Sequence, residues 1–354
     1  MGNIKTSENA KPFVKWAGGK GQLLEQLDKF LPSRLMSEDF TYIEPFVGGG
    51  AMLFHMIKTF KHAKRVIIND VNENLIKAYN VVKVHPETLI NKLDDIQSRY
   101  LAVTDEEKRK DFYLDLRSKF NLHNVDDIQN TVYLIFLNRT CFNGLYRVNS
   151  KGEFNVPFGK YKNPLICNPA NIIADSKALN SKDVIITNGD FEGTRRFIDN
   201  EGLTFYYFDP PYRPLTATAS FTAYSKGNFN DDDQKRLAAF CSDIDSANCL
   251  WMLSNSDSKA QDANDTFIED LYNRYSINKV YASRSINANP LKRGKLTELL
   301  VHNNYKITNS LFFKALSEYR SKIADIKKME QMHKMPAEMF ASEPLPDEDL
   351  PFIE

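Results

Sequence analysis

The sequence has few cysteines and no long apolar run. Four cysteines occur among 354 residues, and no two of them form a C-x-x-C pair. Because zinc and iron–sulfur sites use such pairs, we expect no metal centre, and the thiols are typical of a reduced intracellular protein. The longest strictly apolar run, Val132 to Leu137, is far shorter than the roughly 18 residues of a membrane span. With no signal-peptide pattern at the start, a cytoplasmic protein without membrane contact is expected.

Net charge is also absent, because 46 basic residues balance 46 acidic ones. The balance is uneven along the chain: residues 336–354 contain six acids and no Lys or Arg, so residues 1–335 hold 46 basic against 40 acidic side chains, a net charge of +6. A mildly basic body is compatible with an anionic partner. The acidic tail contains several prolines and is typical of a segment without fixed structure.

Alternating strand and helix signals indicate an α/β fold. Residues 42–44 read as a strand, residues 48–50 as a glycine turn, residues 51–60 as a helix and residues 66–68 as a second strand that ends at Asp70. This order is a βαβ unit. Before it, a helical pattern runs from Leu23 to Leu31, and Pro32 stops it.

An insert divides this α/β domain. Helix-period patterns dominate residues 75–136, glycines and prolines then punctuate short β-prone pieces, and strand signals resume at residue 184. We therefore predict three regions. They are an α/β domain of residues 1–75 and 184–305, an insert of residues 76–183 with a hairpin at 139–162, and a C-terminal helix with an acidic tail at 306–354.

The glycine turn has the layout of an adenosine site. Glycines allow the backbone to approach a ligand, and Asp70, twenty residues after Gly50, can accept hydrogen bonds from both ribose hydroxyls. Leu53 stands where a dinucleotide fingerprint has its third glycine, and Lys20 is not followed by the Ser or Thr of a phosphate-binding loop. An adenosine ligand without phosphate therefore fits best, with a purely structural turn as the alternative.

The tetrapeptide Asp209-Pro210-Pro211-Tyr212 directly follows an apolar strand. Two prolines cannot continue a ladder, so the chain must leave the sheet at the edge where α/β proteins bind ligands. The exocyclic amine of a purine is a poor nucleophile because its lone pair is delocalised into the ring. The Asp209 carboxylate and the Pro210 carbonyl can accept its hydrogens and favour a tetrahedral amine, while Tyr212 can stack on a base that has left the duplex. As a bare string the motif can also be an ordinary turn.

Residues 138–162 form a basic and aromatic stretch. They contain five Lys or Arg side chains and one acid, Glu153, with five aromatic residues between them. Cations and rings in a hairpin are suited to reading a DNA groove, although charge alone also fits a solvated loop.

In this order, these motifs resemble the Dam-family DNA adenine-N6 methyltransferases, the α class of amino-methyltransferases. The resemblance extends from about Phe13 to Val301 and rests on residues 15–20, 44–50, 138–161, 209–212 and 283–286. It implies a Rossmann-like S-adenosylmethionine-dependent methyltransferase domain with a mostly parallel seven-stranded sheet. It also implies an inserted DNA-recognition domain made of helices and a β-hairpin.

The resemblance further implies roles for single residues. Catalysis would use Asp209, Pro210 and Tyr212. S-adenosylmethionine, which leaves as S-adenosylhomocysteine, would contact Trp16, Lys20, Phe46, Gly48, Gly50, Asp70, Asp190 and Phe191. DNA would contact Lys15, Phe142, Asn143, Leu145, Arg147, Pro157, Tyr161, Arg284 and Lys292. The family often has Tyr at position 142 and Arg at position 160, where this chain has Phe and Lys.

The implied function is methylation of adenine N6 in double-stranded DNA, with GATC as the target and base flipping as the route, by a monomer. Arg147 and Lys15 would each read a guanine, and Leu145 and Pro157 would contact a thymine methyl. The alternatives are the same chemistry at a longer site, a catalytically silent DNA-binding relative, or an enzyme that acts on RNA. The presence of Asp209 argues against a catalytically silent protein. A hairpin that reads a major groove argues against an RNA substrate, because the deep major groove of RNA excludes side chains.

Overall fold

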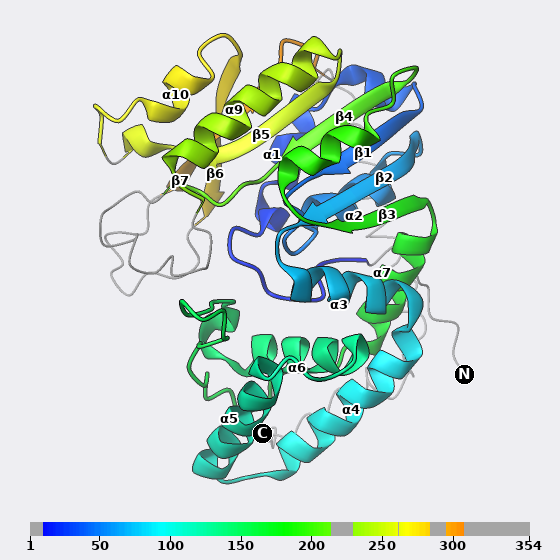
Figure 1. Cartoon of the computed structure of the whole chain (residues 1–354), viewed down its shortest axis with the longest axis vertical. Helices are drawn as coiled ribbons and strands as arrows, with labels where there is room; N and C mark the ends of the chain where they lie inside the picture. Colours follow the sequence, from blue (N-terminus) through cyan, green and yellow to red (C-terminus); the bar gives the residue numbers. More distant parts are fainter. Residues whose placement is uncertain (1–9, 214–228, 261, 284–294, 308–354) are drawn as a thin grey trace, which may run out of the picture. The chain divides into compact units, whose positions relative to one another are not determined.

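The computed structural model describes residues 10–213, 229–260, 262–283 and 295–307 (Figure 1). Within them the strands form one seven-stranded sheet in the order β3-β2-β1-β4-β5-β7-β6. The strands are β1 Phe40–Glu44, β2 Ala63–Asp70, β3 Asp183–Asn188, β4 Leu203–Phe208, β5 Leu250–Ser256, β6 Ser276–Ser283 and β7 Lys295–His302. Neighbours from β3 to β5 are parallel, and β7 is antiparallel to both β5 and β6. The predicted mostly parallel seven-stranded sheet is confirmed.

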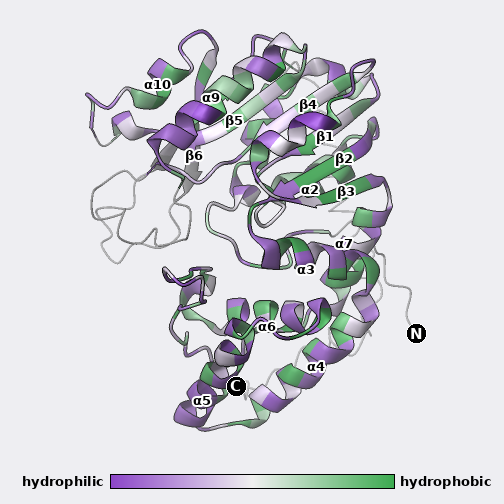
Figure 2. Ribbon diagram, in the orientation of Figure 1, coloured by the Kyte–Doolittle hydropathy of each residue, from purple (hydrophilic) through white to green (hydrophobic). Residues whose placement is uncertain are grey.

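Both faces of the sheet are covered, which explains its continuous apolar strands. All six residues of β4 are buried. Tyr206 and Phe208 point into a cluster with α9 (Asp231–Ser246) and α10 (Phe267–Leu271), whereas Phe205 and Tyr207 belong to the cluster that includes α2 (Ala51–Thr59). Figure 1 shows α9 lying across one face beside β5, and Figure 2 shows the hydrophobic residues along β2 and β3.

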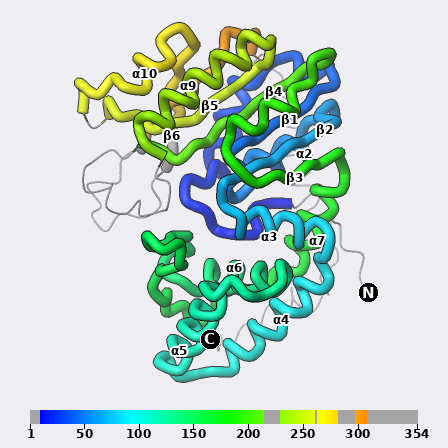
Figure 3. The backbone as a smooth tube through the Cα atoms, in the orientation of Figure 1, coloured from blue at the N-terminus to red at the C-terminus, as the bar shows by residue number. Residues whose placement is uncertain are grey.

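A helical insert connects β2 to β3. The chain runs through α3 (Glu73–Val84), α4 (Pro86–Ala102), α5 (Glu106–Asn121) and α6 (Asp127–Thr140), passes an irregular segment, and returns through α7 (Pro169–Asn180) (Figure 3). Side chains of Asn72, Asp105, Asp126 and Asn168 accept hydrogen bonds from the first turns of α3, α5, α6 and α7. These caps fix where each helix begins. The helical part of the insert is therefore as predicted.

The predicted hairpin at 139–162 is less regular than expected. It contains the turn η4 (Phe142–Gly144) and two isolated bridges, Cys141 with Phe158 and Val148 with Phe154, instead of two continuous strands. Side chains of α5 form hydrogen bonds with backbone groups that would otherwise pair in a β-ladder. The Tyr113 hydroxyl donates to the Val156 carbonyl, and Asn121 pairs with both backbone groups of Phe154. The segment is thus a loop fastened to α5.

The helix predicted over residues 23–31 was wrong as a single element. The structure has two short pieces there, α1 (Leu24–Leu27) and η2 (Asp28–Phe30), and a third, η1 (Lys20–Gln22), just before them. A run this short is marginal as a helix, so tertiary contacts decide its geometry. One such contact is the 2.6 Å pair between Asp28 and His55 of α2.

Three further turns are η3 (Ser33–Met36), η5 (Phe191–Phe197) and η6 (Ser258–Ala260). The described residues, which end at Ile307, form one compact unit. The predicted C-terminal helix and tail lie outside the described residues, and the three predicted domain boundaries stay predictions.

Candidate active site

The candidate site lies at the carboxyl edge of the sheet. Because β1 pairs with β2 on one side and β4 on the other, the segments that follow these strands meet there. They are the glycine turn after Glu44, the segment after Asp70 and the segment that begins with Asp209. The adenosine-type turn and the Asp-Pro-Pro-Tyr motif, more than 150 residues apart in sequence, are therefore neighbours.

Asp209 lies beside an ammonium group. Its Oδ1 is 3.0 Å from the Nζ of Lys20, which the N-terminal segment carries into the site. Burial raises the pKa of Asp209 to about 6, and the Lys20 charge opposes the rise. The Asp209 carboxyl therefore titrates just below neutral pH. Above its pKa it is a carboxylate and can accept hydrogen bonds.

Lys20, predicted as a cofactor contact, is buried beside Asp209 and Tyr212, two residues predicted to be catalytic, which are half-buried. Its Nζ lies 2.5 Å from the Tyr212 hydroxyl and 3.2 Å from Glu298 Oε2, and the Tyr212 hydroxyl donates to the same oxygen at 2.6 Å. Glu298, in β7, was not a predicted site residue. No motif marks it, since its place in the site depends on the antiparallel pairing of β7 with β5.

The glycine turn is held against Asp70. The Gly48 amide donates to Asp70 Oδ2 at 3.0 Å, and the Asn72 amide donates to Oδ1 at 2.9 Å. Burial raises the pKa of Asp70, and these backbone hydrogen bonds oppose the rise. Gly50 has φ +78°, and a side chain there would collide with the Tyr79 hydroxyl. Both the conformation and the lack of space therefore require glycine at position 50.

The remaining predicted cofactor residues surround this turn. Trp16 packs against Gly48 and stacks on Tyr146 with ring centroids 5.1 Å apart. Phe46 packs against Phe191 at 5.4 Å. Asp190, which precedes Phe191, uses its Oδ1 to accept hydrogen bonds from the Glu192 amide and from Arg236.

Asn69 was missed, although it stands next to Asp70. Its side-chain amide donates to the carbonyls of Pro45 and Gly189, at 3.1 and 2.8 Å, and so connects the segments that follow β1 and β3. The sequence indicates a role for Asn69 only through its position directly before Asp70. Asn69 therefore fixes the two sides of the candidate adenosine site relative to each other.

The predicted DNA-contacting residues of the insert form one exposed surface. Phe142 and Leu145 are 53% and 39% exposed, unusual values for large apolar side chains, and Pro157 is exposed beside them. The Arg147 Nε donates to Asn155 Oδ1 at 2.8 Å, which aims the guanidinium. Because the Phe142 amide donates to the Pro157 carbonyl, the two sides of the loop stay together.

Lys15 joins this surface from the N-terminal segment. Its Nζ lies 5.2 Å from the centre of the Tyr161 ring, and the Tyr161 hydroxyl accepts from the Asn143 amide at 3.1 Å. Asn138, buried in α6, pairs with both backbone groups of Lys15 and donates to the Gly144 carbonyl. Asn138 is thus an anchor that the prediction did not include among the site residues.

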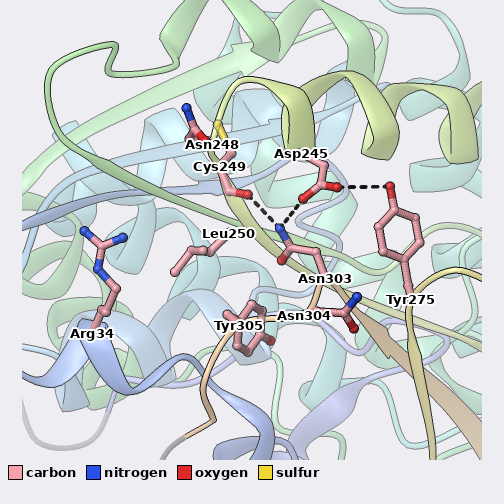
Figure 4. Close-up of a pocket in the computed structure, with 9 residues that line it drawn as sticks. All are labelled: Arg34, Asp245, Asn248, Cys249, Leu250, Tyr275, Asn303, Asn304 and Tyr305. Atoms are coloured by element: carbon pink, nitrogen blue, oxygen red, sulfur yellow. Dashed lines mark hydrogen bonds between the residues drawn. The ribbon is translucent and has the colours of Figure 1, made fainter.

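The other described residues contribute no second candidate site. The Arg284 and Lys292 positions lie outside the described residues. A polar pocket of about 340 Å³ lies at the start of β5, at the opposite edge of the sheet, where Asn303 bonds Asp245 and the Cys249 carbonyl (Figure 4). Among the described residues, no group of three or more His, Cys, Asp or Glu could hold a metal ion, and no helix is long and apolar enough to cross a membrane.

Comparisons with known proteins agree with this geometry. Residues 16–286 match the family described as D12 class N6 adenine-specific DNA methyltransferase. The chain is 48% identical over 297 residues to the Type II methyltransferase M.MjaIII of Methanocaldococcus jannaschii, which covers 83% of this chain and 99% of that protein. It is 38% identical over 302 residues to the Type II methyltransferase M1.LlaDCHI of Lactococcus lactis, covering 84% and 97%. It is 31% identical over 294 residues to the DNA adenine methylase of Escherichia coli, covering 82% and 94%.

These matches span the glycine turn, the recognition insert and the Asp-Pro-Pro-Tyr motif, so the resemblance found in the sequence is confirmed. The chain is a site-specific DNA methyltransferase that acts on adenine N6, and it belongs to the D12 class of N6 adenine-specific DNA methyltransferases.

Proposed function

We propose that the chain transfers a methyl group from S-adenosylmethionine to a flipped adenine, with Asp209 and the Pro210 carbonyl as the acceptors of the amine hydrogens. The observation that carries this proposal is the meeting of Asp209 with the glycine turn and Asp70 at one edge of the sheet. An adenosine donor and an amine acceptor would then lie within reach of each other.

The residues around Asp70 fit an adenosine. The Gly48 and Asn72 amides bond different oxygens of the carboxylate, and its remaining lone pairs can accept from ribose hydroxyls. Val71, the next residue, is 78% exposed and offers an apolar surface that a purine can cover. Trp16, Lys20, Phe46, Gly50, Asp190 and Phe191 complete the proposed contacts.

At the amine, the chain's own groups do the work. When bound, S-adenosylmethionine supplies an electrophilic methyl group and leaves as S-adenosylhomocysteine. Asp209 and the Pro210 carbonyl withdraw the amine hydrogens from the plane of the purine, so the nitrogen lone pair becomes available to the methyl carbon. Tyr212 supports the base by stacking. As the new N–C bond forms, the amine gives up one proton, which the Asp209 carboxylate accepts and passes to water.

We further propose double-stranded GATC as the target, read by a monomer in the cytoplasm. Arg147 offers a guanidinium fork to guanine, Lys15 is close to Asn143 and Tyr161, and Phe142 and Leu145 expose apolar surface that can enter the base stack or cover a thymine methyl. Arg284 and Lys292 would meet phosphates. A palindrome suits a monomer that methylates one strand at each encounter. A longer target is the alternative for the same surface.

The proposal is tested by incubating the purified protein with labelled S-adenosylmethionine and paired duplexes that differ only in GATC, followed by mapping of the modified base. Label on adenine N6 within GATC is the expected result. Label on cytosine, or in RNA only, would overturn the assignment of the reaction. Methylated adenine in duplexes that lack GATC would overturn the target sequence and leave the chemistry intact.

A further inference from the structure

Lys20 is held by three oxygens in the free site, which has consequences for Asp209. The ammonium has three N–H donors, and its neighbours at 2.5 to 3.2 Å are Asp209 Oδ1, the Tyr212 hydroxyl and Glu298 Oε2. Lys20 is 2% exposed and Glu298 7% exposed, so water competes little for these groups. The ammonium thus occupies a carboxylate oxygen that the proposed reaction requires for the substrate amine.

An ammonium paired only with Asp209 would oppose the reaction. It would draw hydrogen-bonding capacity from the carboxylate, and its charge would repel the positive charge that develops on the amine as the methyl group arrives. A second carboxylate within reach of the same ammonium removes this conflict. Glu298 is that carboxylate, and its bond to the Tyr212 hydroxyl also fixes the ring beside Asp209.

We propose that Glu298 is a positioning residue: it retains Lys20 and Tyr212 through its Oε2 so that Asp209 is released to the adenine amine. Glu298 contacts neither substrate nor methyl donor and acts through these two neighbours. The inference rests on the proposed role of Asp209. It adds a requirement for a residue of β7, which lies 278 residues after Lys20 in the sequence.

The test is single-turnover methylation of a duplex that the wild-type protein methylates, measured as a function of pH for Glu298→Gln, with Glu38→Gln as the control. Glu38 forms an ion pair with Arg34 at the surface and does not belong to the group of Lys20, Tyr212 and Asp209. A glutamine keeps an acceptor for Tyr212 but loses the charge that holds Lys20. We expect the rate to fall about 10- to 100-fold, as for a misplaced reacting group, with DNA and cofactor affinities within about twofold.

The pH profile separates positioning from a general loss of structure. Among the described residues, the titratable groups that interact with Asp209 are Lys20, Tyr212, Glu298, Glu44, Tyr42 and Tyr207. The charge of Glu298 helps to raise the pKa of Asp209. Its removal should therefore move the acid limb of the rate to lower pH, and Glu298→Asp, which keeps the charge, should restore the wild-type limb.

A double-mutant cycle completes the test. In a Lys20→Met background, the further change Glu298→Gln should lower the single-turnover rate little more, because the ammonium group that Glu298 holds is absent. A wild-type rate and profile for Glu298→Gln would overturn the inference, and so would an equal loss in both backgrounds with an unmoved acid limb. Failure of the wild-type protein to methylate DNA, or retained activity in Asp209→Ala, would instead overturn the proposed function.

Discussion

At the scale of single residues, the Asp209 carboxyl should set the lower pH limit of the reaction. Its pKa is raised to about 6, mainly by burial. Protonation would remove the negative charge of Asp209 and turn one acceptor oxygen into a donor. The single-turnover rate should therefore be constant above this value and fall about tenfold per pH unit well below it. Rapid-quench measurements between pH 5 and 8 test this. A rate that is flat through this range would contradict the assignment.

Replacement of Asp209 should separate chemistry from binding. We expect Asp209→Ala to reduce methyl transfer about 100-fold or more while it leaves DNA and S-adenosylmethionine affinities nearly unchanged, because the carboxylate acts on the flipped amine. Calorimetry gives the affinities, and Glu38→Ala, which removes a surface carboxylate outside the site, serves as the control. Near-normal turnover of Asp209→Ala would identify another residue as the acceptor.

Asp70→Ala should produce the opposite pattern. Loss of the ribose acceptor should weaken S-adenosylmethionine binding by about 1.5 to 3 kcal/mol, the usual range for hydrogen bonds to a charged group, with DNA affinity retained. Because Asp70 also holds the Gly48 amide, Asp70→Asn is a useful second variant that keeps one acceptor. Equal weakening of both ligands would show that the substitution disturbs the fold of the site.

At the scale of elements, the recognition segment, residues 139–162, should discriminate between DNA sequences through a few side chains. Arg147→Ala should cost about 1 to 3 kcal/mol of discrimination at a single G·C pair and change little at the others. Lys160→Ala is the matched control, since Lys160 pairs with Glu106 beside the same loop. Competition binding with single-base substitutions measures both. A uniform loss across all sequences would mean that Arg147 meets phosphate.

Local sequence patterns predict the helices of the insert better than they predict its hairpin. The helices of the insert follow from apolar periodicity and from capping residues such as Asp105 and Asp126, which are local signals. The hairpin was predicted from Gly and Pro punctuation, yet Tyr113 and Asn121 of α5 take its backbone groups. Contacts of this kind join residues more than 30 positions apart, so no local pattern reports them.

At the scale of the whole molecule, buried Asp175 should make stability depend on pH. Desolvation raises its pKa to about 8, although the Lys11 amide bonds its Oδ1. The folded state therefore binds a proton that the unfolded chain has lost between about pH 4 and 8, and the free energy of unfolding falls as pH rises through this window, by up to about 1.4 kcal/mol per unit.

Asp175→Asn removes this proton equilibrium. The variant should lose less stability than the wild-type protein between pH 5.5 and 8, and urea denaturation at the two pH values measures the difference in slope. Glu38→Gln, at the surface, should retain the wild-type slope. Parallel stability profiles for wild type and Asp175→Asn would show that the carboxyl titrates normally.

The sheet and most of the site could be predicted because the motifs lie where strands end. Asp70 and Asp209 each follow an apolar strand, and parallel strands bring such ends together. Glu298 could not be found this way. It lies inside an antiparallel strand whose register with β5 depends on contacts throughout the molecule. Asn138 was missed for a related reason, since a buried amide in a helix gives no sign of the backbone that it binds.

The anchoring of Lys15 by Asn138 has a thermodynamic consequence. Trp16, the next residue, stacks on Tyr146 of the recognition segment and packs against Gly48 of the glycine turn, so one short stretch of backbone borders both ligand surfaces. A ligand that stiffens this stretch lowers the entropy cost for the other. The two binding equilibria should then be reciprocal: the factor by which S-adenosylhomocysteine tightens DNA must equal the factor by which DNA tightens S-adenosylhomocysteine. Asn138→Ala should bring both factors toward one.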